Sequence, residues 1–399
     1  MEINFDDFCV YGPPPKDGKT FVGIKIENNS PKVYFPYGYR KSTEPLKIQN
    51  DILNLIDILA SYIPKIEGAT SFGKWDKLPV HAYINVYTYF FNKGYFVERQ
   101  QIYKKGNHGK IDWGKTIKLV QPMLSQNKPI YLEYITQSKR IDDSEIITQI
   151  HKHCLIESYK RFGFLFGFPN TEKPTIPFNR GMFLSILKLK ISHTFNENDL
   201  QLFQSMVSII ESTGNETNKD MFYGTFEFHH IWETLINETF GIQNKKRYNP
   251  HYQYYKVENG HETEARPPVP LKPDTIMKEG DDTFILDAKF YRFGVSGDFR
   301  DVPEAESITK QMAYAEFVEN KLGVNGNNIY NAFILPYPSP NPTPDYDMEK
   351  KFSIKVDWKP NNRKYETIDG IVLDTKTLMY RHKFSSESIR KLAEIIRGN

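Results

Sequence analysis

Residues 271–291 contain two short β-type runs on either side of a polar turn, which predicts a β-hairpin. The turn is the acidic sequence Glu-Gly-Asp-Asp at 279–282. Asp274 stands at the start of the first run, and Asp287 and Lys289 stand in the second. On a twisted hairpin the start of the first strand can lie beside the middle of the second. We therefore expect both carboxylates and the ammonium group to occupy one small volume.

The apolar pattern on both sides of the hairpin predicts two helices and a buried strand. Upstream, residues 226–236 place apolar side chains at i, i+3, i+4 and i+7, which indicates an amphipathic helix. Downstream, residues 308–317 have a helical pattern, and residues 330–337 are an apolar run that suits a buried strand. The order helix, hairpin, helix, strand indicates a compact α/β core.

The two helices offer further polar groups to the hairpin. Glu233 lies beside the apolar stripe of the first helix and is the candidate for a third carboxylate, although Glu227 competes for that role. Gln311 and Tyr314 lie one turn apart on a common face of the second helix. A surface position without a chemical role is the alternative interpretation for Gln311.

The hairpin residues have the chemistry of metal-dependent phosphodiester hydrolysis. Two carboxylates and the carbonyl of Ala288 are hard oxygen ligands for Mg²⁺, which keeps water molecules for the nucleophile and the scissile phosphate. Mn²⁺ can substitute for Mg²⁺ in such a site. Lys289 is expected to orient the attacking water or to help deprotonate it. The alternative is structural: Asp274 as a turn or cap residue and Lys289 as a solvated strand residue.

These residues resemble the motif of the PD-(D/E)xK nuclease superfamily, in which a helix-borne Glu, a Pro-Asp and an (Asp/Glu)-x-Lys bind metal and activate water. The resemblance implies a restriction-endonuclease-like core, a mixed central sheet flanked by helices, with the metal-binding and catalytic roles on Glu233, Asp274, Asp287 and Lys289. Residues 285–292, 309–311 and 331–337 are similar to the LlaJI-type restriction endonucleases, which in turn resemble McrC, the nuclease subunit of McrBC systems. Gln311 is then a supporting residue.

The same resemblance implies a Mg²⁺-dependent DNA endonuclease, type II-like or McrC-like, that restricts foreign double-stranded DNA. Hydrolysis would leave a 5′-phosphate and a 3′-hydroxyl. An AAA+ GTPase of the McrB kind is the implied partner. The sequence leaves open whether two copies of the chain form a homodimer on DNA. Two alternatives remain: a repair or recombination nuclease on branched or damaged DNA, and a non-catalytic DNA-binding or scaffolding subunit with the same fold.

Basic residues in two regions are candidates for phosphate contacts. Lys272 and Arg292 flank the hairpin, although a strand-edge Lys is also a common protection against aggregation. A Gly-rich stretch upstream surrounds Trp113 with lysines. From that stretch we expect DNA contacts by Lys104, Lys105, Lys110 and Lys115. Solvated loop charges are the alternative interpretation.

The pattern along the chain predicts three parts. Residues 1–120 alternate strand-like and helical runs and are expected to be an α+β domain for target or partner recognition. Residues 121–220 are expected to be a mostly helical linker domain, and residues 221–399 the nuclease domain. A hinge is predicted at 212–217, and the alternating prolines of 337–344 predict an extended connector.

Composition limits the remaining classes of function. The chain has 399 residues, 39% hydrophobic and 25% charged, enough for two or three domains. No apolar run approaches the length of a membrane span, and the acidic N-terminus differs from a secretory signal, so a cytoplasmic protein is expected. Residues 12–20 end like a phosphate-binding loop, but their spacing and three prolines argue against nucleotide binding.

Overall fold

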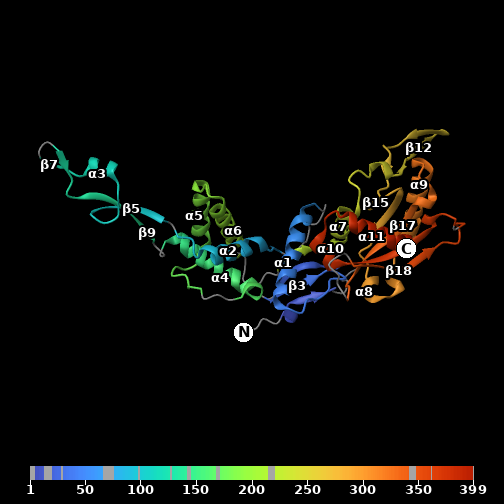
Figure 1. The fold of residues 1–399 in the computed structure, drawn as a ribbon, viewed down its shortest axis with the longest axis horizontal. Coiled ribbons are helices and arrows are strands. Elements are labelled where there is room, and N and C mark those ends of the chain that lie inside the picture. The colour runs from blue at the N-terminus through green and yellow to red at the C-terminus, as the bar shows by residue number, and fades with distance from the viewer. Residues whose placement is uncertain are drawn as a thin grey trace. The chain divides into compact units, whose positions relative to one another are not determined.

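The computed structural model describes residues 5–12, 20–27, 30–65, 76–97, 99–125, 128–141, 145–167, 171–213, 221–340, 347–360 and 362–398 (Figure 1). The chain divides into two compact units. The first contains the described residues of Met1–Glu27, Pro31–Trp75 and Phe222–Asn399, and the second those of Asn28–Ser30 and Asp76–Met221. This division differs from the predicted boundaries at 120 and 220. Three segments named in the sequence analysis lie partly outside the described residues: 13–19 of the segment that ends like a phosphate-binding loop, 214–217 of the predicted hinge, and 341–344, half of the predicted connector.

The core of the first unit is a five-stranded sheet, and it is mixed, as the family resemblance implied. Its order is β15-β16-β17-β19-β18, with bounds Thr275–Glu279, Asp282–Ala288, Ile329–Tyr337, Thr367–Asp374 and Met348–Lys355. β15 and β16 form the predicted antiparallel hairpin, while β16, β17 and β19 run parallel and β18 is antiparallel to β19. The apolar run of β17 suits its central position, because a parallel strand is covered on both faces.

Helices cover this sheet. On one face, α9 (Ala305–Leu322) contributes Met312, Ala315 and Val318 to an apolar cluster with residues of the strands, among them Phe333. Residues that alternate with these along the strands, such as Ile334, are also buried, so the opposite face is covered as well. The remaining helices of this part are α7 (Phe228–Phe240), α8 (Phe293–Ser296), α10 (Thr375–Arg381) and α11 (Ser386–Arg397).

The N-terminal residues belong to the same unit as this core. Strands β1 (Cys9–Tyr11), β3 (Ser30–Phe35), β2 (Val22–Glu27) and β10 (Met221–Thr225) are neighbours in that order, and α1 covers Pro45–Tyr62. Asp51 of α1 accepts hydrogen bonds from Lys376 Nζ at 2.7 Å and Tyr380 Oη at 2.9 Å. Thr375 Oγ1 donates to the carbonyl of Tyr37 at 3.0 Å. Residues 31–65 therefore pack on the core instead of forming a domain of their own.

The second unit combines a helical part with small sheets. Its helices are α2 (Val80–Lys93), α3 (Trp113–Leu119), α4 (Ile146–Phe166), α5 (Arg180–His193) and α6 (Glu197–Thr213). A three-stranded sheet has the order β5-β9-β6, with bounds Arg99–Gly106, Tyr134–Ile141 and Lys110–Ile111. β4 (Asp76–Lys77), β7 (Met123–Ser125) and β8 (Lys128–Ile130) are short. The predicted helical character of 121–220 begins at residue 146 and follows a β region.

Short elements of the first unit complete the fold. They are η1 (Phe5–Asp7), η2 (Ile63–Lys65), η3 (Lys246–Tyr248), β11 (His251–Tyr252), β12 (Tyr255–Glu258), β13 (His261–Glu264), β14 (Val269–Pro270), η4 (Phe299–Asp301), η5 (Gly326–Asn328) and η6 (Lys364–Glu366). Among the helices of the described residues, none has the length and apolar character that a bilayer crossing would need.

Candidate active site

The hairpin β15–β16 brings Asp274 beside the end of β16. The register pairs Thr275 with Leu286, so Asp274, the residue before β15, lies across from the last residues of the second strand. The backbone N–H of Ala288 donates a hydrogen bond to Asp274 Oδ2 at 3.0 Å. The Asp274 carboxylate therefore lies beside Ala288 and close to its two neighbours, Asp287 and Lys289.

Lys289 lies in the same volume as the two aspartates. Its Nζ is 3.0 Å from Asp287 Oδ2, and the two side chains are only 22% and 14% exposed. Its backbone N–H donates to the carbonyl of Ile334 at 2.9 Å, which fixes Lys289 beside the central strand β17. Burial disfavours the ammonium form, but the negative charges of Asp287 and Asp274 outweigh it and raise the pKa of Lys289.

Helix α7 delivers Glu233 to the hairpin. The preceding residue, Trp232, is fully buried and its Nε1 donates to the carbonyl of Ile334 at 3.2 Å, which anchors the helix on β17. Burial raises the pKa of Glu233, His230 lowers it, and the charge of Asp287 raises it again, with a net increase. Glu233 thus lies close enough to the aspartates for their charges to interact. The competing candidate, Glu227, precedes α7 and lies on the same cavity.

Asp274 is the most strongly perturbed carboxyl of the group. Burial, the hydrogen bond with Asp287 and the charges of Asp287 and Glu233 together raise the pKa of Asp274 to about 9. Three carboxyl groups in one partly buried site repel one another, and a bound divalent cation would relieve that repulsion. The donor set of carboxylates and a backbone carbonyl is of the type that binds Mg²⁺. The residues present therefore fit such an ion.

A cavity of 760 Å³ opens beside these residues. Its walls include Glu233, Ala288 and Lys289 together with the basic residues Arg292 and Arg300. The N-terminal part of the chain also contributes, through Thr20 and Tyr37, whose hydroxyl groups are hydrogen bonded to each other. A cavity lined by both carboxylates and guanidinium groups can hold a metal ion next to a phosphate group.

Lys245 is a neighbour of the site that the sequence did not reveal. Its Nζ donates to Asn237 Oδ1 at 3.0 Å and to the backbone carbonyl of Asp274. Burial lowers the pKa of Lys245, and the charges of Asp274 and Glu233 oppose that decrease. No spacing pattern connects residue 245 to residue 274, and the same is true of Thr20 and Tyr37. Only the tertiary fold brings them to the site.

Gln311 is not brought into the carboxylate group. It is fully buried under the sheet, where its Nε2 donates to the carbonyls of Ile285 and Ala332, each at 3.2 Å. These carbonyls belong to the neighbouring strands β16 and β17, so the Gln311 side chain links the two strands. Tyr314 donates from Oη to the carbonyl of Lys272 at 3.3 Å, and burial followed by the charges of Asp274 and Asp287 raises its pKa to about 12.

The predicted DNA-binding residues fall into two groups. Lys104 and Lys105 on β5, Lys110 on β6 and Lys115 on α3 all belong to the second unit, and the first three are exposed. Lys105 forms an ion pair with Glu133 at 2.8 Å, with both side chains 57% exposed. In the first unit, Lys272 is exposed beside the hairpin, whereas Arg292 lies on the cavity wall. Arg292 is thus the only one of the six among the residues that line this cavity.

Comparison with known proteins identifies the family. The profile of the LlaJI restriction endonucleases matches residues 80–355. The chain belongs to this family. The matched range of the LlaJI restriction endonuclease family includes Glu233, Asp274, Asp287 and Lys289. This membership confirms the resemblance that the hairpin motif indicated.

The chain is also similar to individual proteins. The component YdjA of the type II restriction enzyme BsuMI of Bacillus subtilis (strain 168) is 29% identical over 261 residues, which cover 61% of this chain and 55% of the relative. The chain therefore spans about half the length of this curated relative. A solved structure of Thermococcus gammatolerans McrB AAA+ hexamers with bound McrC matches with a TM-score of 0.35 and 12% identity, over 93% of this chain and 82% of that chain.

Proposed function

We propose that the chain is a metal-dependent DNA endonuclease of a restriction system, which hydrolyses phosphodiester bonds to a 5′-phosphate and a 3′-hydroxyl. The observation that carries this proposal is the convergence of Asp274, Asp287 and Lys289 at the end of one hairpin, in a chain of a restriction endonuclease family. A decayed site in a scaffolding subunit would be expected to lose at least one of these groups.

The proposed metal ligands are Asp274, Asp287, Glu233 and the carbonyl of Ala288. Mg²⁺, or Mn²⁺ in its place, would supply Lewis-acid stabilisation of the phosphate charge and a lower pKa of water. The environment of the carboxyls supports this assignment. Burial first, and then the neighbouring carboxylates, raise the pKa of Asp274 and Glu233, so a cation at this place would favour their ionised forms.

Lys289 is proposed to act as a charged hydrogen-bond donor. Its pKa is raised, so the side chain stays protonated at neutral pH and is poorly suited to remove a proton. Held 3.0 Å from Asp287, it can orient the attacking water and stabilise the negative charge that develops on the phosphate. Of the two roles expected from the sequence, the geometry and charge favour orientation over deprotonation.

The substrate is proposed to be double-stranded DNA. Arg292 and Arg300 lie on the cavity that contains Lys289, and guanidinium groups bind phosphate with two parallel hydrogen bonds. Lys104, Lys105, Lys110 and Lys115 of the second unit are proposed to contact DNA phosphates. These contacts would position the duplex without reading its sequence.

The partner is proposed to be an AAA+ GTPase of the McrB kind. This part rests on the similarity of the motif at 285–292 to LlaJI-type enzymes and McrC. In addition, the relative YdjA is named as a component of BsuMI, so that enzyme has more than one component by its name. Two copies of the chain on one duplex are proposed to cut the two strands, because one such site cuts one strand at a time.

Plasmid cleavage tests the proposal. Wild-type chain and the Asp287→Asn variant are incubated with methylated and unmethylated plasmid and Mg²⁺, first alone and then with GTP and the product of the neighbouring gene. Cleavage by the wild type alone, lost in the variant, supports a self-sufficient enzyme. Cleavage only with GTP and partner supports the McrC-like role. No cleavage under any condition, with DNA binding intact, would favour the scaffolding or branched-DNA alternative.

A further inference from the structure

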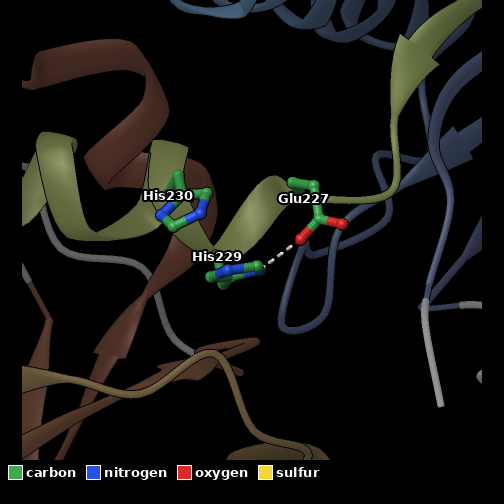
Figure 2. Close-up of side chains that lie close together, drawn as sticks. All are labelled: Glu227, His229 and His230. Atoms are coloured by element: carbon green, nitrogen blue, oxygen red, sulfur yellow. Dashed lines mark ion pairs between the residues drawn. The ribbon is translucent and has the colours of Figure 1, made fainter. Parts of the chain in front are cut away.

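Glu227, His229 and His230 form a cluster of donor atoms at the start of α7 (Figure 2). One ligand atom of each residue lies within 4.8 Å of the other two. Glu227 is the residue before the helix and the two histidines belong to its first turn, so a short stretch of chain supplies the whole cluster. The proposed carboxylate site uses Glu233, one turn further along, and leaves the two histidines without a role.

The spacing within the cluster suits a single ion. Two ligand atoms at about 2.1 Å from one tetrahedral ion are about 3.4 Å apart. Glu227 Oε2 and His229 Nδ1 are 3.6 Å apart, and Figure 2 shows the two side chains turned toward each other. The imidazole rings of His229 and His230 have centroids 4.0 Å apart. Small side-chain rotations would therefore bring all three donors onto one ion.

His230 is oriented by a second carboxylate. Its Nδ1 lies 3.5 Å from Glu233 Oε2, so Nε2 is the nitrogen that can face an ion. A carboxylate on one nitrogen and a metal on the other is a frequent arrangement of metal-binding histidines, because the carboxylate fixes the ring and its tautomer. The pair His230–Glu233 thus provides the outer support that such a ligand needs.

We propose that Glu227, His229 and His230 bind a transition-metal ion such as Zn²⁺ or Co²⁺, at a site distinct from the carboxylate site of Asp274 and Asp287. Two imidazoles and one carboxylate select a borderline ion over Mg²⁺ or Ca²⁺, which prefer oxygen ligands. The positive end of the α7 dipole disfavours a cation here, so the strong nitrogen donors must supply the affinity. Mg²⁺ lacks that affinity for nitrogen.

The position of the ion would matter to the cavity. Glu227 and His229 line the same 760 Å³ cavity as Glu233 and Lys289. An ion on the cluster would add positive charge to the lining of a cavity that also contains Arg292 and Arg300. It would also hold His230, and through it Glu233, in one orientation. The site is therefore placed to bind a phosphate group or to support the carboxylate site.

Titration of the full chain with Co²⁺ in excess Mg²⁺ tests the proposal, because the visible absorption of Co²⁺ reports its ligands and Mg²⁺ occupies oxygen sites. The wild type should bind one Co²⁺ with the spectrum of a low-coordinate nitrogen-containing site, and Zn²⁺ should displace it. His229→Gln and His230→Gln should each weaken binding at least tenfold, and Glu227→Gln should weaken it less. His251→Gln, an exposed histidine of the same unit, is the matched control and should change nothing.

Asp287→Asn separates this site from the catalytic carboxylates and should leave Co²⁺ binding unchanged. Unchanged binding in both cluster histidine variants, or loss of binding in Asp287→Asn, would overturn the proposal. A footprint on the wild type avoids any effect of substitution on folding: Zn²⁺ should protect His229 and His230, but not His251, from modification by diethylpyrocarbonate. Equal modification of all three with and without Zn²⁺ would also contradict the site.

Discussion

The backbone N–H of Ala288 donates to Asp274 Oδ2 at 3.0 Å and thereby connects the two ends of the β15–β16 hairpin. The bond holds the Asp274 carboxylate against the backbone between Asp287 and Lys289. A carboxylate that accepts a backbone hydrogen bond is oriented before any metal arrives, which reduces the entropy lost on binding. The carbonyl of the same residue, Ala288, is a proposed ligand. Both backbone groups of one residue thus serve the same site.

The metal-free protein should become less stable as the pH rises, because of Asp274. Its pKa is raised from 3.8 to about 9 in the folded state, so the stability that protonation provides is fully present below 3.8 and is lost as the pH rises toward 9. Urea unfolding in EDTA between pH 5 and pH 9 measures the decrease. Asp274→Asn keeps an acceptor for Ala288 but cannot ionise, so its unfolding free energy should vary less over this range. Asp281→Asn, in the exposed turn, should behave as the wild type.

Addition of Mg²⁺ should reverse that decrease. An ion that binds only the folded state adds stability by mass action, and it binds best when the carboxyls are ionised. At pH 8 the melting temperature of the wild type should therefore increase with Mg²⁺ concentration, whereas those of Asp274→Asn and Asp287→Asn should increase little. Equal increases in wild type and both variants would place the ion elsewhere.

Lys289→Met should remove cleavage while DNA binding persists. The methionine keeps the length of the side chain but loses the charge that lies 3.0 Å from Asp287. We expect the single-turnover cleavage rate to fall by about 10²–10³-fold, the loss typical of removing one preorganised hydrogen-bond donor. Binding of the plasmid, measured without metal, should change less than about threefold, because the exposed basic residues provide most phosphate contacts. Lys278→Met, on the neighbouring strand and partly buried, is the control and should keep the rate.

Gln311→Leu should affect folding more than chemistry. The substitution removes two buried hydrogen bonds to the carbonyls of Ile285 and Ala332, and we expect a loss of about 1–3 kcal/mol in the free energy of unfolding. Mg²⁺ should still stabilise the variant, and its cleavage rate at low temperature should remain close to that of the wild type. A rate lowered a hundredfold in a stable variant would instead restore the supporting catalytic role that the sequence motif suggests.

The local part of the site could be predicted from the sequence, because a hairpin fixes its own geometry. The β-type runs around Gly280 specify both strands and their turn, and the spacing from Asp274 to Lys289 then follows from the register. The strand β17 was also predicted, from its run of apolar residues. The helices α7 and α9 were predicted from their periodicity, with ends that the structure extends to Phe240 and Leu322.

The rest depends on contacts between distant residues. The direction of Glu233 is set by the anchor of Trp232 on Ile334, more than a hundred residues away. Lys245 reaches Asp274 only because the segment after α7 returns to the hairpin. The helical pattern around Gln311 cannot tell that its amide group lies under the sheet instead of in the cavity. The N-terminal residues read as a separate domain because local patterns do not report packing between Tyr37 and Thr375.

Gly38→Ala tests that packing directly. Gly38 has φ +69, and a Cβ atom there would lie 2.4 Å from the backbone nitrogen of Tyr337 and 2.6 Å from Thr375 Oγ1. The backbone at the end of β17 cannot move without disturbing the central sheet, so strain and overlap together should cost about 2–4 kcal/mol in unfolding free energy. Gly323 has nearly the same φ, +70, but open space around it. Gly323→Ala should therefore cost only about 1–2 kcal/mol, from the backbone conformation alone. Equal losses in the two variants, measured by urea unfolding of the full chain, would mean that Gly38 does not lie against the core.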